Sequence, residues 1–560
     1  MAAQLKPLKG AENLKSRWQW SRDLGGPDMP IRLEGEIGDV MVRGTIPDSI
    51  DGTFYRVAGD HVTPVPEKHS PLEGHGAVSA FRIHKGHVDF KIRYVQNDRY
   101  KVERANRKSM FVDIVGHPME NHPCVRAVTE QTSNINVIHW GGRLLALNEI
   151  GQAWTMDADT LETTGVNPYG NQVFQSSTFS AHPKIDQNVD ELVTWGFGSK
   201  FEELVSYSVT RQGEVKNLHR IMRSISGTIH DVAITENWLV FCQWPTIPSR
   251  KAGTSRLVWD TSLPTVFIVS PRRPDKPLAG SGWKPYEHRI YTHNSNTEIV
   301  HTGGAWEENG KIIFEGTWPN QPKSSWFNWW DQKEQGPDQK AGFIRDSRPE
   351  NTVVEYVRFE IDATKPDLTE LADPAVLVSI SNEFPRIDER FYCKPHDYVF
   401  MNIVHADPDT PHDPTHVYRS LNATAMLNKR TGEMNVYSPG PHCRCQEPVF
   451  IPRSDNAPEG DGHIIFAVDR LDINLTNIVI LDTKDFEHPV AVIELPMRMR
   501  AQVHGNWVDA KELSGKPLVP TPPPQPHGLA GKTVTFLLSG GSLCTKGYFN
   551  SQSEIISHLS

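Results

Sequence analysis

The sequence contains no long apolar run. None of its apolar stretches approaches the roughly 20 residues that a membrane-spanning helix needs. Residues 1–9 also lack the apolar segment of a secretory signal. These two absences predict a cytoplasmic protein. They do not indicate contact with a membrane, which stays open.

Cysteine is scarce as well. Six cysteines in 560 residues do not make the dense disulfide framework of small secreted domains. Two of them, Cys443 and Cys445, are separated by a single arginine. That spacing is too short for a zinc knuckle, and no second pair accompanies it. We therefore expect free thiols and no cysteine-bound metal.

Basic residues are in deficit, and long amphipathic helical stretches are nearly missing. The net charge of −10 argues against a nucleic-acid partner. Short segments of alternating apolar and polar residues take the place of helices, separated by many of the 41 glycines and 42 prolines. The strongest strand candidates are residues 52–57, 77–83, 88–95, 143–147, 153–157, 353–359, 398–403, 464–468, 478–481 and 533–538. This pattern indicates an all-β sandwich, barrel or propeller, and no crisp repeat distinguishes the three.

Two regions depart from the strand pattern. We expect residues 1–35 to form an N-terminal arm, with Trp18 and Trp20 as its contacts, and residues 36–560 to form a single domain. Within that domain, residues 318–345 are an expected insertion that holds three tryptophans between Trp326 and Trp330. Three adjacent indole rings need an apolar partner. They either pin the insertion to the body of the protein, or they form a wall of an apolar substrate tunnel or a patch that touches lipid.

Four of the 24 histidines stand in distinctive surroundings. His182 lies in Phe-Ser-Ala-His-Pro-Lys, His230 in Thr-Ile-His-Asp-Val-Ala, His301 in His-Thr-Gly-Gly-Ala-Trp, and His504 in Gln-Val-His-Gly-Asn-Trp. Glycine has no Cβ, so we expect the two glycines after His301 to let the backbone approach whatever its ring binds. Other histidines are interpreted as ordinary surface or core residues, among them His69, His75, His84, His87 and His139.

Together these four segments resemble the iron-ligand segments of the carotenoid cleavage oxygenase family, which includes stilbene-cleaving and lignostilbene-type dioxygenases. The resemblance covers roughly residues 45–550. It implies an all-β fold, a seven-bladed β-propeller with a dome of loops and short helices over the metal-bearing end. It also implies that His182, His230, His301 and His504 converge near the propeller axis and bind Fe(II).

The family orients three of its metal-binding histidines with glutamates, and three matching segments occur here: Leu-Asn-Glu, Asn-Glu-Phe-Pro-Arg and Gln-Glu-Pro-Val-Phe. A metal-bound histidine usually donates its other N–H to such a carboxylate. The pairs implied by analogy are Glu149 with His230, Glu383 with His301, and Glu447 with His504, which leaves His182 without a carboxylate.

The implied donor set bears on the metal. Imidazole suits iron, zinc, copper and nickel alike, so the number of ligands has to decide. Four neutral histidines leave the double positive charge of the ion intact, and an octahedral ion would keep two positions open. A structural zinc site is closed and tetrahedral, and a catalytic zinc normally has three protein ligands. The set therefore disfavours a zinc hydrolase, and the identity of the metal as Fe(II), with O2 as co-substrate, is what the family resemblance implies.

The substrate class is suggested by one likeness and one departure. The segment around His301 is closer to that of the stilbene cleavers than to the His-x-x-Asn-Ala of many carotenoid cleavers. Stilbene cleavers, however, contact the 4-hydroxyl of the substrate through a lysine just before the first orienting glutamate and through an upstream tyrosine. Here Asn148 takes the lysine position, and residues 111–118 contain no tyrosine. Asn148 can hydrogen-bond a phenol but cannot stabilise a phenolate as a cation does, so the phenol clamp is altered or lost. Asn148 stays a candidate substrate contact, and a non-phenolic or methoxylated aryl-alkene, or an apocarotenoid, stays open as the substrate.

These features predict a non-haem Fe(II) dioxygenase that cleaves the C=C bond of a small aryl-alkene, of the stilbene, isoeugenol or vinylphenol type, into two carbonyl products. No side chain beyond the metal centre needs to act as an acid or base. Three alternatives stay open beside the zinc hydrolase. They are cleavage of an apocarotenoid or carotenoid, a non-oxidative isomerase or isomerohydrolase of the same family, and a non-catalytic propeller used for protein interaction.

Overall fold

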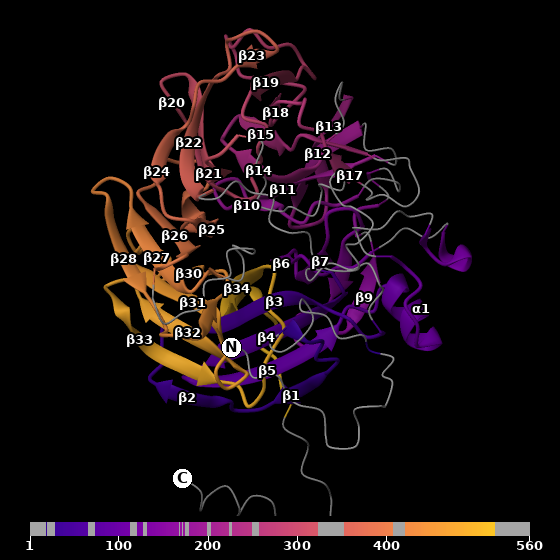
Figure 1. Ribbon diagram of the computed structural model, residues 1–560, viewed down its shortest axis with the longest axis vertical. Helices are drawn as coiled ribbons and strands as arrows, with labels where there is room; N and C mark the ends of the chain where they lie inside the picture. Colours follow the sequence, from indigo (N-terminus) through magenta and orange to yellow (C-terminus); the bar gives the residue numbers. More distant parts are fainter. Residues whose placement is uncertain are drawn as a thin grey trace, which may run out of the picture. The chain divides into compact units, whose positions relative to one another are not determined.

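The computed structural model describes residues 18, 28–64, 73–112, 120–126, 131–166, 168–170, 172–173, 178–198, 203–222, 227–248, 257–322, 352–406 and 420–520. The chain divides into two units, Met1–Val519 and Pro520–Ser560. All of the described helices and strands belong to the first unit, and Figure 1 colours them along the sequence.

Within the described residues, seven sheets of four to six strands form the blades of a β-propeller (Figure 1). Blade 1 consists of β1 (Gly35–Ile37), β3 (Gly52–Asp60), β4 (His75–His84), β5 (His87–Tyr94) and β34 (Gly505–Asp509). Blade 2 consists of β6 (Asn136–Trp140), β7 (Arg143–Leu147), β8 (Trp154–Met156) and β9 (Thr163–Val166). Blade 3 consists of β10 (Lys184–Asp186), β11 (Glu191–Phe197), β12 (Glu203–Thr210) and β13 (Val215–Met222). Neighbouring strands within each of these three sheets run antiparallel.

Blades 4 to 7 follow in chain order. Blade 4 consists of β14 (Ile229–Ile234), β15 (Trp238–Gln243), β18 (Thr265–Pro271), β19 (Arg289–His293) and β23 (Thr369–Glu370), and blade 5 of β20 (Thr302–Glu308), β21 (Lys311–Pro319), β22 (Val354–Asp362) and β24 (Ala375–Val378). Blade 6 consists of β25 (Asn382–Arg386), β26 (Tyr398–Ile403), β27 (Ala423–Asn428) and β28 (Glu433–Tyr437). Blade 7 consists of β2 (Met41–Gly44), β29 (Cys443–Cys445), β30 (Val449–Pro452), β31 (Gly462–Arg470), β32 (Leu475–Asp482) and β33 (Asp485–Glu494). A two-stranded ribbon, β16 (Thr246–Pro248) with β17 (Leu257–Trp259), lies between β15 and β18 in the sequence.

The two ends of the described chain close the ring. Strand β34, near the C-terminal end, pairs with β3 in blade 1, in a register that sets Phe54 opposite Trp507. Strand β2, near the N-terminal end, pairs with β33 in blade 7. Each of these two blades therefore contains strands from opposite ends of the sequence.

Hydrophobic clusters fill the spaces between successive blades. Phe81 of blade 1 and Ile465 of blade 7 belong to one such cluster, and Phe267 of blade 4 packs with Phe314 of blade 5 in another. Equivalent clusters join the remaining neighbouring blades around the ring. Because most strands have a neighbour sheet on both faces, apolar residues are buried on both sides of many of them.

The strand predictions are confirmed wherever the structure describes them. Residues 143–147 and 398–403 coincide with β7 and β26, and the other candidates up to residue 481 overlap strands. Cys443 and Cys445 are buried free thiols, as expected. The seven-bladed propeller implied by the resemblance is confirmed too.

Helix α1 (Asp98–Asn106) was not predicted. It begins after Asn97, whose side chain accepts a hydrogen bond from Tyr100 N, and it ends at Arg107 in the left-handed conformation. It belongs to the connection from β5 to β6, which enters blade 2 at the end where the inner strands begin. The short 3-10 helices are η4 (Pro123–Val125), η6 (Glu389–Phe391) and η7 (Ala510–Glu512).

Several predicted features lie wholly or largely outside the described residues. The arm of residues 1–35 is described only at Trp18 and residues 28–35. The segment Trp326 to Trp330, most of the insertion 318–345 and the strand expected at 533–538 lie outside the described residues. Trp18 itself lies under the Arg32 guanidinium, 3.9 Å from the ring centre. The division into an arm and one domain stays a prediction. Among the described residues, no helix combines the length and apolarity that crossing a membrane requires.

Candidate metal centre

The four histidines singled out in the sequence lie together where the inner strands of four blades begin. His182 stands two residues before β10, His230 lies within β14, and His301 and His504 immediately precede β20 and β34. One ring nitrogen of each lies within 4.8 Å of the other three, and all four side chains are buried. They converge because the inner strands surround one axis, a relation that their spacing in the sequence does not contain.

Three glutamates from the remaining blades hold three of these rings. Glu149 accepts a hydrogen bond from His230 Nδ1. Glu383 Oε2 lies 2.5 Å from His301 Nδ1, and Glu447 Oε1 lies 3.0 Å from His504 Nδ1. An Nδ1–H that donates to a carboxylate leaves the Nε2 lone pair free. Each of the seven blades thus contributes one histidine or one glutamate.

The Nε2 atoms form a set of donors that fits a metal ion. Among the described residues, Nε2 of His182 and Nε2 of His504 are buried without a hydrogen-bond partner. Nε2 of His230 and Nε2 of His301 face each other at 3.1 Å. Buried polar atoms are normally paired, and convergent lone pairs need a shared cation. Four imidazole nitrogens are a donor set that iron, zinc, copper and nickel all accept.

The electrostatics of the centre differ from ring to ring. Burial, together with the neighbouring rings, lowers the pKa of His182 well below its ordinary value. Burial also lowers the pKa of His504, against the opposing effect of Glu447. At His230 burial acts to lower the pKa, but Glu149 together with Asp231 and Glu383 outweighs it, so that the pKa is raised. Burial alone would raise the pKa of Glu447, but His504 and Arg386 hold it at about 2. These shifts favour the neutral form of His182 and of His504, and the ionised Glu447 lies beside His504.

The glycines after His301 serve a neighbouring cluster. A Cβ at Gly303 would collide with the Tyr356 hydroxyl, and one at Gly304 would collide with the His396 ring. Those two side chains surround a buried carboxylate in what we call the Glu315 cluster: Glu315, Tyr356, Arg358, His396 and Lys429. The space that the glycines leave is thus occupied by protein, which corrects the expectation that it admits a ligand of His301.

Asn148 is buried directly before Glu149. Its Nδ2 donates to Thr132 Oγ1 at 3.1 Å, and Thr132 Oγ1 donates in turn to Asn134 Oδ1 at 2.7 Å. In this arrangement the amide nitrogen of Asn148 faces Thr132. Asn148 Oδ1 is left as a buried acceptor without a partner among the described residues.

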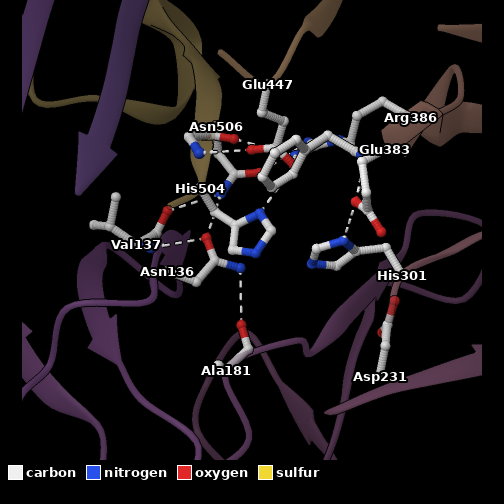
Figure 2. A network of polar contacts seen from close by, with 12 residues as sticks. Asn136, Val137, Ala181, Asp231, His301, Glu383, Arg386, Glu447, His504 and Asn506 are labelled. Carbon is white, nitrogen blue, oxygen red and sulfur yellow. Dashed lines mark hydrogen bonds and ion pairs between the residues drawn. The ribbon is translucent and has the colours of Figure 1, made fainter. Parts of the chain in front are cut away.

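A polar network that the sequence analysis missed surrounds His504 (Figure 2). Arg386 donates to Glu447 Oε1 at 3.1 Å and to Asn506 Oδ1 at 2.9 Å. Asn506 Nδ2 donates to Asn136 Oδ1 at 2.9 Å, and Asn136 Nδ2 donates to Ala181 O at 2.8 Å (Figure 2). In the sequence, the sign of this network was that Asn506 stands two residues after His504 and Arg386 stands three residues after Glu383.

A propeller with four histidines on its axis and one supporting carboxylate behind each of three rings defines a class of metal-binding β-propellers. The profile of the family described as "Retinal pigment epithelial membrane protein" matches residues 29–509. The chain therefore belongs to this family, the carotenoid oxygenase family.

Individual relatives cover nearly the whole chain. "Resveratrol cleavage oxygenase 1" of Botryotinia fuckeliana is 40% identical over 514 residues, which is 90% of this chain and 89% of the relative. "Isoeugenol monooxygenase" of Pseudomonas nitroreducens is 32% identical over 87% of this chain and 97% of its own length. The crystal structure of Pseudomonas brassicacearum lignostilbene dioxygenase superposes with a TM-score of 0.78 at 29% identity, covering 88% of this chain and 99% of that one.

Proposed function

We propose that the protein is a non-haem Fe(II) dioxygenase that cleaves the C=C double bond of a small aryl-alkene with O2 and yields two carbonyl products. The observation that carries this proposal is the convergence of four buried Nε2 atoms, three of them on rings fixed by carboxylates. The family and the oxygenase names of the relatives support a metal-dependent oxygenase.

His182, His230, His301 and His504 would hold Fe(II), which supplies the activation of O2 when it is bound. The residues of the chain prepare the site for it. Glu149, Glu383 and Glu447 keep a proton on Nδ1 of their partner rings, so that each Nε2 presents its lone pair to the axis. Because no carboxylate oxygen lies among the four convergent donors, the ion keeps its full charge.

The substrate class follows from the relatives and from Asn148. The relatives are named for resveratrol, isoeugenol and lignostilbene, which are aryl-alkenes. We propose that the unpaired Oδ1 of Asn148 accepts a hydrogen bond from a neutral phenolic hydroxyl of the substrate. A lysine would instead favour the phenolate. A buried acceptor of this kind rejects an analogue that lacks the donor, because the acceptor then stays unpaired.

The test is aldehyde formation by Fe(II)-loaded protein in air, with resveratrol, isoeugenol, an O-methylated resveratrol and an apocarotenal as substrates. We expect aldehydes from the two phenols and less from the methylated compound, because the ether cannot donate to Asn148 Oδ1. ¹⁸O from O2 is expected in the carbonyl products, and no product is expected without O2.

The other outcomes identify the alternatives. Product from the apocarotenal alone would show that the substrate is an apocarotenoid and not an aryl-alkene. The relative "Carotenoid cleavage oxygenase 1" of Neurospora crassa, 33% identical over 87% of this chain, supports this alternative. An isomerase or isomerohydrolase would give products without label from O2. Preferential zinc binding with hydrolysis would favour the hydrolase, and the absence of any metal would favour the interaction propeller. The cytoplasmic location and the lack of a nucleic-acid partner stay predictions of the sequence.

A further inference from the structure

The three glutamates fix the rotation of single rings, but they do not fix the distances between the four segments that carry the histidines. On one side the rings of His182, His301 and His504 border a cavity of about 60 Å³. Phe384, which lines the same cavity, packs on the rings of His301 and His504, with ring centres 5.2 Å and 5.6 Å apart. Polar contacts between the four segments add to this packing.

Asp231 joins three of these segments. This residue follows His230, is 1% exposed, and accepts hydrogen bonds from Thr302 N and Thr302 Oγ1, both at 2.8 Å. Lys184 Nζ lies 2.8 Å from Asp231 Oδ1 and donates to Oδ2 at 3.0 Å. Thr302 directly follows His301, and Lys184 stands two residues after His182. Asp231 is thus itself the neighbour of His230 in blade 4, and its carboxylate binds the neighbours of His182 in blade 3 and of His301 in blade 5.

The network in Figure 2 joins the fourth segment to the others. Asn506, two residues after His504, donates to Asn136, which holds the carbonyl of Ala181 directly before His182. Arg386 donates to Asn506 and lies on β25, the strand that also carries Glu383, the partner of His301. The links therefore run from segment to segment around the whole centre and close on themselves.

We propose that six residues form a closed polar belt that positions the four histidines, with Asp231 as its hub. The belt consists of Asn136, Lys184, Asp231, Thr302, Arg386 and Asn506, all of which border the cavity beside the rings. The inference rests on the proposed metal site and assigns its geometry to residues that do not touch the metal. Asp231 is a positioning residue, because it acts through Lys184, Thr302 and the backbone of His230.

The charge and the acceptor capacity of Asp231 are both needed for this role. An amide in its place loses one of the two acceptor oxygens and leaves the Lys184 ammonium buried without its counter-ion. The segments of blades 3, 4 and 5 then lose their common anchor. The rings keep their own glutamates, so the expected consequence is a loosened arrangement of four intact ligands, not the loss of one.

The test measures Co(II) binding by competition with a chromophoric chelator, together with the ligand-field absorption of bound Co(II), in the full-length wild type and in Asp231→Asn. The matched control is Asp186→Asn. Asp186 is also buried, lies on β10 and pairs with a cation, Arg272 at 2.6 Å. Its carboxylate lies outside the belt, and Arg272 donates in turn to Thr235 O, which follows β14 at the end away from His230. Thr302→Val is a milder second variant that removes one donor to Asp231 without removing a charge.

We expect Asp231→Asn to bind Co(II) about 10-fold to 100-fold more weakly, the range found for residues that support metal ligands, with shifted absorption bands. Thr302→Val should weaken Co(II) binding and shift the absorption bands in the same direction, by a smaller factor. If Asp231→Asn does not fold, Thr302→Val serves as the test of the belt. Asp186→Asn should keep the wild-type affinity and bands even where its melting temperature falls.

Wild-type affinity and bands in folded Asp231→Asn and Thr302→Val would overturn the belt while leaving the metal site in place. Equal losses in Asp186→Asn would overturn it too, because they would assign the effect to general destabilisation. A wild type that binds no Co(II) would overturn the proposed metal site and this inference with it.

Discussion

The four-histidine centre and the Glu315 cluster are both buried, both contain histidine and glutamate, and both involve the hairpin of β20 and β21. They differ in how their polar atoms are matched. In the Glu315 cluster the carboxylate accepts from Tyr356 at 2.9 Å, from Arg358 at 2.7 Å and from Lys429 at 2.8 Å. In the centre, four Nε2 atoms converge, and two of them have no partner among the described residues.

The comparison shows that a buried group of titratable residues does not by itself make a site. A carboxylate that is surrounded by donors has its hydrogen-bonding capacity filled by the protein itself and needs no ligand. Lone pairs that converge without a donor are incomplete until a cation binds. The two clusters differ in what their ring nitrogens face: His396 Nε2 faces the Glu315 carboxylate at 3.2 Å, whereas the nitrogens of the centre face one another.

The largest expected effect comes from removing a histidine on each side of this comparison. His301→Ala should lower aldehyde formation by more than the about 10-fold to 100-fold expected when a supporting residue is lost, because one of the four donors itself is removed. His396→Ala, the matched control in the Glu315 cluster, should retain iron and activity but melt at a lower temperature. Iron content and initial rates check both variants, and equal losses of iron would abolish the distinction.

Removal of the metal is expected to come next. At a free metal concentration of 1,000 times Kd, binding stabilises the folded state by about 4 kcal/mol, which a chelator removes. Melting curves with and without chelator measure this difference. Glu315→Gln should show the same shift as the wild type, whereas His301→Ala should show little. A shift that Glu315→Gln reduces would mean that the two clusters are coupled.

Glu315→Gln is expected to lower the free energy of unfolding by about 3 kcal/mol, because it leaves buried cations without their carboxylate. Burial raises the pKa of Glu315, but His396 and Lys429 outweigh it and hold the pKa at about 2. A carboxyl group with a lowered pKa stabilises the fold above its ordinary pKa, and that contribution is lost as the pH falls toward 2. Urea unfolding at pH 7 and pH 3 should therefore show a smaller acid sensitivity in Glu315→Gln than in the wild type. Equal acid sensitivity would contradict the assignment.

The smallest of these effects is expected for Glu447→Gln. The amide can accept from Nδ1–H through its oxygen or donate to Nδ1 through its nitrogen, so it no longer fixes the His504 tautomer, and metal affinity should fall about 10-fold to 100-fold while all four ligands remain. Competition titrations measure the change. Because Arg386 also contacts Glu447, Glu383→Gln is a useful parallel variant. Unchanged affinity in both would show that the carboxylates do not support the rings.

The sequence predicted individual strands well, because alternation of apolar and polar residues is a local property. It could not predict ring closure, since β3 and β34 pair across more than 400 residues. The convergence of the histidines came from the family resemblance and not from spacing. Helix α1 was missed because its nine residues are mostly polar and have no apolar stripe, although Asn97 offered a capping signal.

Residues that act through other residues were the hardest to predict. Asp231, Lys184 and Thr302 look like ordinary polar residues at the starts of strands, and only their positions next to histidines distinguish them. Gly303 and Gly304 gave a correct signal of close approach but a wrong partner. A glycine records that space is needed, and the sequence does not say which side chain fills it.

The pairing of β34 with β3 also determines when the centre can be completed during synthesis. His504 is the last of the four histidines to leave the ribosome, and it immediately precedes the strand that closes the ring. A nascent chain that ends before Asp509 has an open first blade, and one that ends before His504 has only three of the histidines. All four histidines can therefore bind a metal together only after almost the entire propeller has been translated. A chain truncated before His504 lacks the fourth histidine.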